Sequence, residues 1–120
     1  MITIVAGTNR RGSITSIFAD NISSIYSRHE VKSKVLDLAE LPPETFSPDA
    51  YLEKPPKVLE FTSHILDSSG IVIVVPEYNG SMPGALKLFI DLLPYPDSFE
   101  GRPVSVSYTH LRAHETCLDL

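Results

Sequence analysis

Short apolar runs alternate with amphipathic segments along this chain of 120 residues. Ile2–Ala6 and Ile71–Val75 are almost wholly apolar and rich in β-branched residues. Such runs are typical of strands that are covered on both faces, as inside a parallel sheet. Val31–Leu38 and Arg102–Ser107 are weaker runs of the same kind, which we interpret as two further strands.

Helical spacing of apolar residues occupies the segments between these runs. Ser13 is the predicted N-cap of a first helix, whose apolar residues recur at intervals of three and four and are expected to face a core: Ile14, Ile17, Phe18, Ile22 and Ile25. A second helix is predicted over Pro56–Ser69, with Gly70 as a left-handed residue at its end. A third begins at Pro83, and its predicted apolar face consists of Leu86, Phe89, Ile90 and Leu93. The region Leu41–Pro56 holds five of the ten prolines and predicts a long surface loop.

The alternation of strands and helices predicts an α/β fold. Strands that are joined through helices form a parallel sheet with right-handed crossovers and with helices on both faces. The length suits one domain. Ligands of such sheets bind beyond the carboxyl ends of the strands, so the loops that follow the first and third strands are the candidate site.

Composition narrows the class of partner. The net charge of −5 disfavours a nucleic-acid partner, and no apolar run is long enough to span a membrane. Met1 leads directly into the first predicted strand, so we expect no signal peptide. Because Cys117 is the only cysteine, no intrachain disulfide is possible, and we expect a cytoplasmic protein.

The loop after the first strand, residues 7–15, has the donors that a phosphate group needs. It offers hydroxyls at positions 8, 13 and 15, a guanidinium at 10 or 11, and the free amides of a starting helix. Gly7 and Gly12 allow the backbone to turn tightly. The alternative is an ordinary Ser-capped helix that follows a polar turn, and the loop matches neither a Walker loop nor a dinucleotide fingerprint.

The loop after the third strand, residues 76–83, suits a planar heterocycle. Pro76 and Pro83 bracket it, Gly80 is expected to expose backbone N–H groups, and Tyr78 offers a flat amphipathic surface. The alternative here is an ordinary turn into a helix. Both loops should lie side by side at one rim of the sheet, so we expect Arg10 and Tyr78 to be neighbours.

These two loops resemble those of NADPH-dependent FMN reductases. Gly7-Thr8-x-Arg10-x-x-Ser13-x-Thr15 is similar to the family's phosphate loop G-S-x-R-x-x-S-x-N, and Pro76-Glu77-Tyr78-Asn79-Gly80-Ser81 matches its flavin loop P-E-Y-N-x-S. The resemblance implies a three-layer flavodoxin-like fold with strand order 2-1-3-4 and a missing fifth strand. The family's site residues then correspond here to a phosphate set, Thr8, Arg10, Ser13 and Thr15, and a ring set, Pro76, Glu77, Tyr78, Asn79, Gly80 and Ser81.

The resemblance also implies the chemistry. Such enzymes take a hydride from NADPH (or NADH) onto bound FMN and pass electrons to free flavin, a quinone or another small-molecule acceptor, and the full-length parent is expected to be a homo-oligomer. Since the cofactor carries the difficult step, we expect no catalytic side chain and no metal, and Glu77 is not expected to act as a base. An electron-carrier flavodoxin fits the two motifs less well.

The end of the chain departs from the family pattern. The resemblance ends near Val104, and we expect residues 1–106 to form an incomplete FMN-binding domain and residues 107–120 to be a tail that is either non-native or disordered or helical. His110, His114 and Cys117 have helical spacing, but we do not expect them to form a zinc site. Without the family's last helix, the apolar surface of Ile14–Ile25 is expected to be wet and the fourth strand to be an exposed edge. The alternative function is therefore a truncated, catalytically incompetent fragment that binds flavin weakly or not at all.

Overall fold

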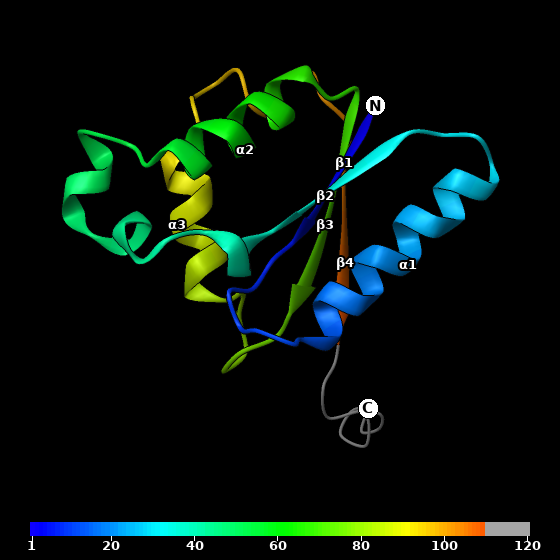
Figure 1. Ribbon diagram of the computed structural model, residues 1–120, viewed down its shortest axis with the longest axis horizontal. Coiled ribbons are helices and arrows are strands. Elements are labelled where there is room, and N and C mark those ends of the chain that lie inside the picture. Colours follow the sequence, from blue (N-terminus) through cyan, green and yellow to red (C-terminus); the bar gives the residue numbers. More distant parts are fainter. Residues whose placement is uncertain (110–120) are drawn as a thin grey trace.

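The computed structural model describes residues 1–109 and contains one parallel sheet (Figure 1). Its strands are β1 (Ile2–Ala6), β2 (Ser33–Asp37), β3 (Gly70–Pro76) and β4 (Val104–Thr109), in the order β2-β1-β3-β4. All neighbouring pairs are parallel. The predicted α/β class and the order 2-1-3-4 are confirmed.

Within residues 1–109, three α-helices cover the two faces of the sheet. Helix α1 (Ile14–Arg28) lies on one face, and α2 (Pro56–Asp67) and α3 (Gly84–Leu92) lie on the other, which gives three layers (Figure 1). The larger core is between the sheet and α2 and α3, where Phe61 meets Phe89 edge to face at 6.1 Å between ring centroids. The smaller core packs Ala19 of α1 against Ile4, Ala6 and Val74.

The prediction that the apolar stripe of α1 faces the core is wrong. Ser13 caps the helix as expected, but Thr15 and Ala19 are its buried residues, and Ile22 is only half-buried. The other members of the predicted stripe are exposed: Ile14 (58%), Ile17 (59%), Phe18 (40%) and Ile25 (45%). The small side chain of Ala19 brings the helix close to the sheet, which turns the larger residues outward. Their exposure agrees with the expectation of a wet apolar surface on this helix.

Several boundaries also differ from the predicted ones. The region 41–56 is not a featureless surface loop, because it forms two 3₁₀ turns, Pro43–Phe46 and Pro48–Tyr51, and buries Leu41, Thr45 and Ala50. Helix α2 ends at Asp67 with Ser68 as its C-cap.

The prediction for Gly70 is wrong, because this residue opens β3 and does not cap α2. Strand β4 begins and ends two residues later than predicted and forms one edge of the described sheet. Within residues 1–109, no helix is long and apolar enough to cross a membrane. None of these shifts changes the strand ends at which the candidate site lies.

Candidate flavin site

The two predicted loops leave neighbouring strands and meet at one rim of the sheet, the lower edge in Figure 1. The Thr8 hydroxyl and the Tyr78 hydroxyl are hydrogen-bonded at 2.9 Å. The Arg10 guanidinium carbon lies 4.8 Å from the centroid of the Tyr78 ring, within the range of a cation–π contact. Arg10 and Tyr78 are therefore neighbours, as the sequence predicts.

Gly7 allows this close approach. Its N–H donates to the carbonyl of Val74 at 2.8 Å, which continues the β1–β3 pairing into the first loop. A Cβ atom at this position would lie 2.8 Å from the same carbonyl oxygen and 3.1 Å from the Leu86 side chain. A side chain would force the two strand ends apart, so glycine at position 7 is a steric requirement of the rim.

The start of α1 presents free donors toward the rim. The Ser13 hydroxyl accepts a hydrogen bond from the Ser16 amide at 3.0 Å, which caps the helix. The amides of Ile14 and Thr15 have no hydrogen-bond acceptor within residues 1–109. Together with the positive end of the helix dipole and the exposed guanidinium of Arg10, these amides are suited to an anionic oxygen.

The two threonines of the phosphate set are both buried. Thr8 is fully buried, and its hydroxyl accepts from the Arg10 amide at 3.2 Å in addition to its bond with Tyr78. Thr15 is 1% exposed, and its hydroxyl is bonded to that of Thr109, at the end of β4, at 3.1 Å. Both hydroxyls thus have protein partners, whereas the Arg10 side chain is exposed.

The ring loop is a tight hairpin. Tyr78 and Ser81 exchange two backbone hydrogen bonds, and the two residues between them, Asn79 and Gly80, have φ values of 54° and 82°. This is the geometry of a two-residue type I′ turn, for which Asn-Gly is the preferred sequence. The hairpin places the Asn79 side chain and its amide at an exposed tip.

The expectation that Gly80 offers a free N–H is wrong. Its amide donates to the Glu77 carboxylate, a bond within the hairpin. The amides of Tyr78 and Ser81 are also used inside the turn, whereas that of Asn79 has no acceptor within residues 1–109. Glu77 therefore braces the loop.

The donor set fits a ligand that joins an anionic group to a planar polar ring. The first-turn amides and Arg10 are suited to the anionic group, and Tyr78, which Arg10 contacts, and the Asn79 tip are suited to the ring. FMN has this composition, a phosphate and a flat ring with carbonyls and nitrogens. Pro76 is the last residue of β3 and Ser81 closes the turn, so both fix the loop.

Two residues near this rim were not among the predicted site residues. Asp37, the last residue of β2, accepts from the Ser16 hydroxyl at 2.8 Å and from the Ala39 amide at 2.9 Å. Its position at the carboxyl end of a predicted strand was the available signal. Ser16 itself lies one position beyond the recognised motif.

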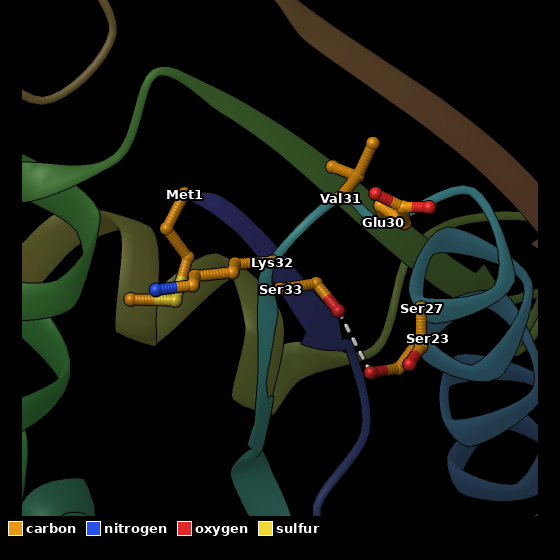
Figure 2. Close-up of a pocket in the computed structure, with 7 residues that line it drawn as sticks. All are labelled: Met1, Ser23, Ser27, Glu30, Val31, Lys32 and Ser33. Atoms are coloured by element: carbon orange, nitrogen blue, oxygen red, sulfur yellow. Dashed lines mark hydrogen bonds between the residues drawn. The ribbon is translucent and has the colours of Figure 1, made fainter.

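Other candidate sites lie elsewhere or carry no ligand set. A cavity of about 560 Å³ lies at the opposite end of the sheet, where β1 and β2 begin, and Ser23 and Ser33 are hydrogen-bonded in its wall (Figure 2). It is open, and the two loops do not reach it.

The described part of the chain holds no cluster of side chains that could ligate a metal, and His110, His114 and Cys117 lie outside the described residues.

The curated relatives of the chain include quinone reductases. It is 31% identical to a 2-hydroxy-1,4-benzoquinone reductase of a Burkholderia species over 98% of its own length and 64% of the relative's. It is also 31% identical to a quinone reductase of Escherichia coli K12, over 88% of this chain and 57% of the relative's. The chain thus spans about three fifths of the length of these relatives.

Solved structures share the fold. An NADH:FMN oxidoreductase (EMOB, apo form) aligns with a TM-score of 0.76 and 24% identity, over 98% of this chain and 63% of that one. The NAD(P)H:acceptor flavoenzyme FerB of Paracoccus denitrificans aligns with a TM-score of 0.71 and 25% identity, over 89% of this chain and 59% of that one. The family model described as NADPH-dependent FMN reductase matches residues 1–116, which include both loops. By this match, and with both motifs at one rim of the sheet, the chain belongs to the NADPH-dependent FMN reductase family.

Proposed function

We propose that this chain provides the FMN-binding rim of an NAD(P)H-dependent oxidoreductase that reduces a small acceptor such as a quinone or a free flavin. When bound, FMN accepts a hydride from the nicotinamide cofactor and supplies electrons to the acceptor. The quinone reductases among the relatives support this acceptor class.

The phosphate end of the site is assigned to Arg10, Ser13 and the first-turn amides of α1. Arg10 is exposed and carries a permanent positive charge, so its guanidinium is accessible for pairing with a phosphate. Ser13 fixes the first turn, which aims the free amides of Ile14 and Thr15. Through this geometry, Thr15 contributes its amide, while its buried hydroxyl holds α1 against β4.

The ring end is assigned to the hairpin between Pro76 and Ser81. Tyr78 is held by its hydrogen bond to the Thr8 hydroxyl, and the Asn79 amide, which has no acceptor within residues 1–109, is the donor at the tip. Glu77 and Gly80 hold the turn closed. A rigid loop orients a planar ring at a lower entropic cost than a mobile one, which is the protein's main task when the cofactor performs the chemistry.

The observation that carries the proposal is the contact between Arg10 and Tyr78. These residues come from motifs almost seventy positions apart, and only a parallel β1–β3 pairing places both at one rim. Were they at opposite ends of the sheet, one ligand could not touch both.

Flavin binding tests the proposal directly. The purified protein should bind FMN, seen as quenching of flavin fluorescence, and the bound flavin should bleach when NADPH or NADH is added. Arg10→Ala should weaken FMN binding by about tenfold or more, because a charge-assisted bond to phosphate is lost, and should change riboflavin binding far less.

Arg11→Ala is the matched control, since Arg11 is an exposed arginine of the same loop. Equal losses for FMN and riboflavin in Arg10→Ala would remove Arg10 from the phosphate site. A colourless protein that ignores added FMN would leave the incompetent-fragment alternative.

A further inference from the structure

Asp37 is held at the rim by two hydrogen bonds from different elements. It is the last residue of β2 and lies beside Ala6, the last residue of β1 before the phosphate loop. One carboxylate oxygen accepts from the Ser16 hydroxyl at 2.8 Å and the other from the Ala39 amide at 2.9 Å. With both oxygens engaged, the half-buried side chain has a fixed orientation.

Ser16 connects this carboxylate to the cap of α1. Its side chain donates to Asp37, and its backbone amide donates to the Ser13 hydroxyl at 3.0 Å. A change at Asp37 therefore reaches Ser13 through a single residue. The free amides of Ile14 and Thr15 lie between the two ends of this link.

A second link between α1 and β2 provides a comparison within the same helix. Ser23 is bonded to Ser33 at 2.7 Å, two turns further along α1 and at the opposite end of the strands. That bond also fixes the helix on the sheet, but it does not touch the phosphate loop. The Ser16–Asp37 bond is therefore the one of the pair that can set the geometry of the first turn.

The charge of Asp37 has two opposing effects at this place. A carboxylate beside the first turn of a helix is favoured by the helix dipole. It also lies close to the site proposed for an anion, and no ion pair within residues 1–109 neutralises it. The hydrogen bonds of Asp37 therefore favour phosphate binding, because they align the first-turn amides of α1. The negative charge of Asp37 disfavours phosphate binding.

We propose that Asp37 is a positioning residue for the phosphate end of the flavin site, acting through Ser16 on the capped first turn of α1. The inference rests on the proposed FMN site. It predicts that Asp37 and Ser16 act as one unit and that their loss affects recognition of the phosphate rather than of the ring.

A double-mutant cycle on the full chain tests this. Asp37→Ala and Ser16→Ala should each weaken FMN binding by about tenfold, the double variant should be no weaker than either, and riboflavin binding should stay within about twofold. Asp37→Asn preserves the shape and can still bond to Ser16, so it should bind FMN at least as tightly as the wild type. Ser23→Ala is the control and should change neither affinity.

Amide exchange of the flavin-free protein, followed by NMR, gives a reading that needs no cofactor. The Ser16 amide should exchange about two- to tenfold faster in Asp37→Ala, equivalent to one net hydrogen bond, and at the wild-type rate in Ser23→Ala. Unchanged exchange together with unchanged FMN affinity would overturn the inference. So would additive losses, or equal losses for FMN and riboflavin. A wild-type protein that binds neither flavin would defeat the proposed function, and the exchange rates alone would then decide whether Asp37 fixes the first turn.

Discussion

Replacing Gly7 by alanine is the sharpest test of how the rim is built. The added Cβ would lie 2.8 Å from the Val74 carbonyl oxygen, a backbone atom, and 3.1 Å from a Leu86 methyl group. The leucine can rotate away, but the carbonyl cannot, because it belongs to β3 between two paired strands. The strain must be relieved by separating the ends of β1 and β3.

The expected cost combines two effects. Inserting a methyl group into a packed position costs about 1–3 kcal/mol, and weakening the 2.8 Å bond from the Gly7 amide to Val74 costs about 0.5–1.5 kcal/mol. A loss of about 2–4 kcal/mol is large beside the roughly 5–15 kcal/mol of a typical domain. The same separation should lengthen the 2.9 Å bond between Thr8 and Tyr78 and so impair flavin binding.

Urea unfolding followed by circular dichroism measures the first effect, and FMN titration measures the second. Gly84→Ala is the control, since a Cβ there meets nothing within 4 Å and the residue is the first of α3. It should raise stability by about 0.5–1 kcal/mol because alanine favours the helix. A Gly7→Ala protein as stable as the wild type, with intact FMN affinity, would refute the steric argument for the rim.

Two further substitutions test the scaffold around the site. The Arg102 guanidinium donates to four backbone carbonyls, among them that of Ser68 at the end of α2. Arg102→Ala should therefore lower the free energy of unfolding by about 2–3 kcal/mol, and a loss below about 0.5 kcal/mol in urea unfolding would contradict this. Glu30 has a φ of 60° just after the end of α1, where the Val31 amide donates to the Tyr26 carbonyl. Because glycine adopts positive φ without strain, Glu30→Gly should raise the free energy of unfolding by about 0.5–1 kcal/mol and with it the melting temperature. A lower melting temperature would show that the left-handed backbone at this position is not strained.

The fold follows from local patterns wherever the apolar residues of an element match its buried surface. Strand β3 and helix α3 were predictable because Ile71–Val75 has no polar face and because Leu86 and Phe89 share the buried side of the helix. The direction of α1 was not predictable. Spacing identifies a stripe of isoleucines, but the sheet contacts the neighbouring stripe of Thr15 and Ala19, and periodicity does not report which of two adjacent stripes lies against a partner.

The candidate site divides in the same way. Arg10, Ser13 and Tyr78 could be named because each belongs to a short motif at a predicted strand end. The Asn-Gly pair also carries the signal for the type I′ turn that consumes the Gly80 amide, since both of its residues adopt positive φ with little strain. Asp37 could not be assigned a partner, because Ser16 lies 21 residues earlier in the chain and the bond exists only once β2 pairs with β1.

The two kinds of contact at the rim should therefore respond differently to mutation. The Arg10 side chain contacts another side chain of the site, Tyr78, and is proposed to contact the ligand. Its loss should therefore change the affinity for FMN while the sheet remains intact. The contact of Gly7 with Val74 belongs to the sheet itself, and its loss should lower stability and affinity together. The Asp37 side chain is intermediate, because in the proposed role it neither touches the ligand nor bonds one strand to another, yet it fixes the turn from which the donors project. If Asp37→Ala lowers FMN affinity without lowering the free energy of unfolding, whereas Gly7→Ala lowers both, then Asp37 aligns the donors and Gly7 is needed for the sheet to form the rim.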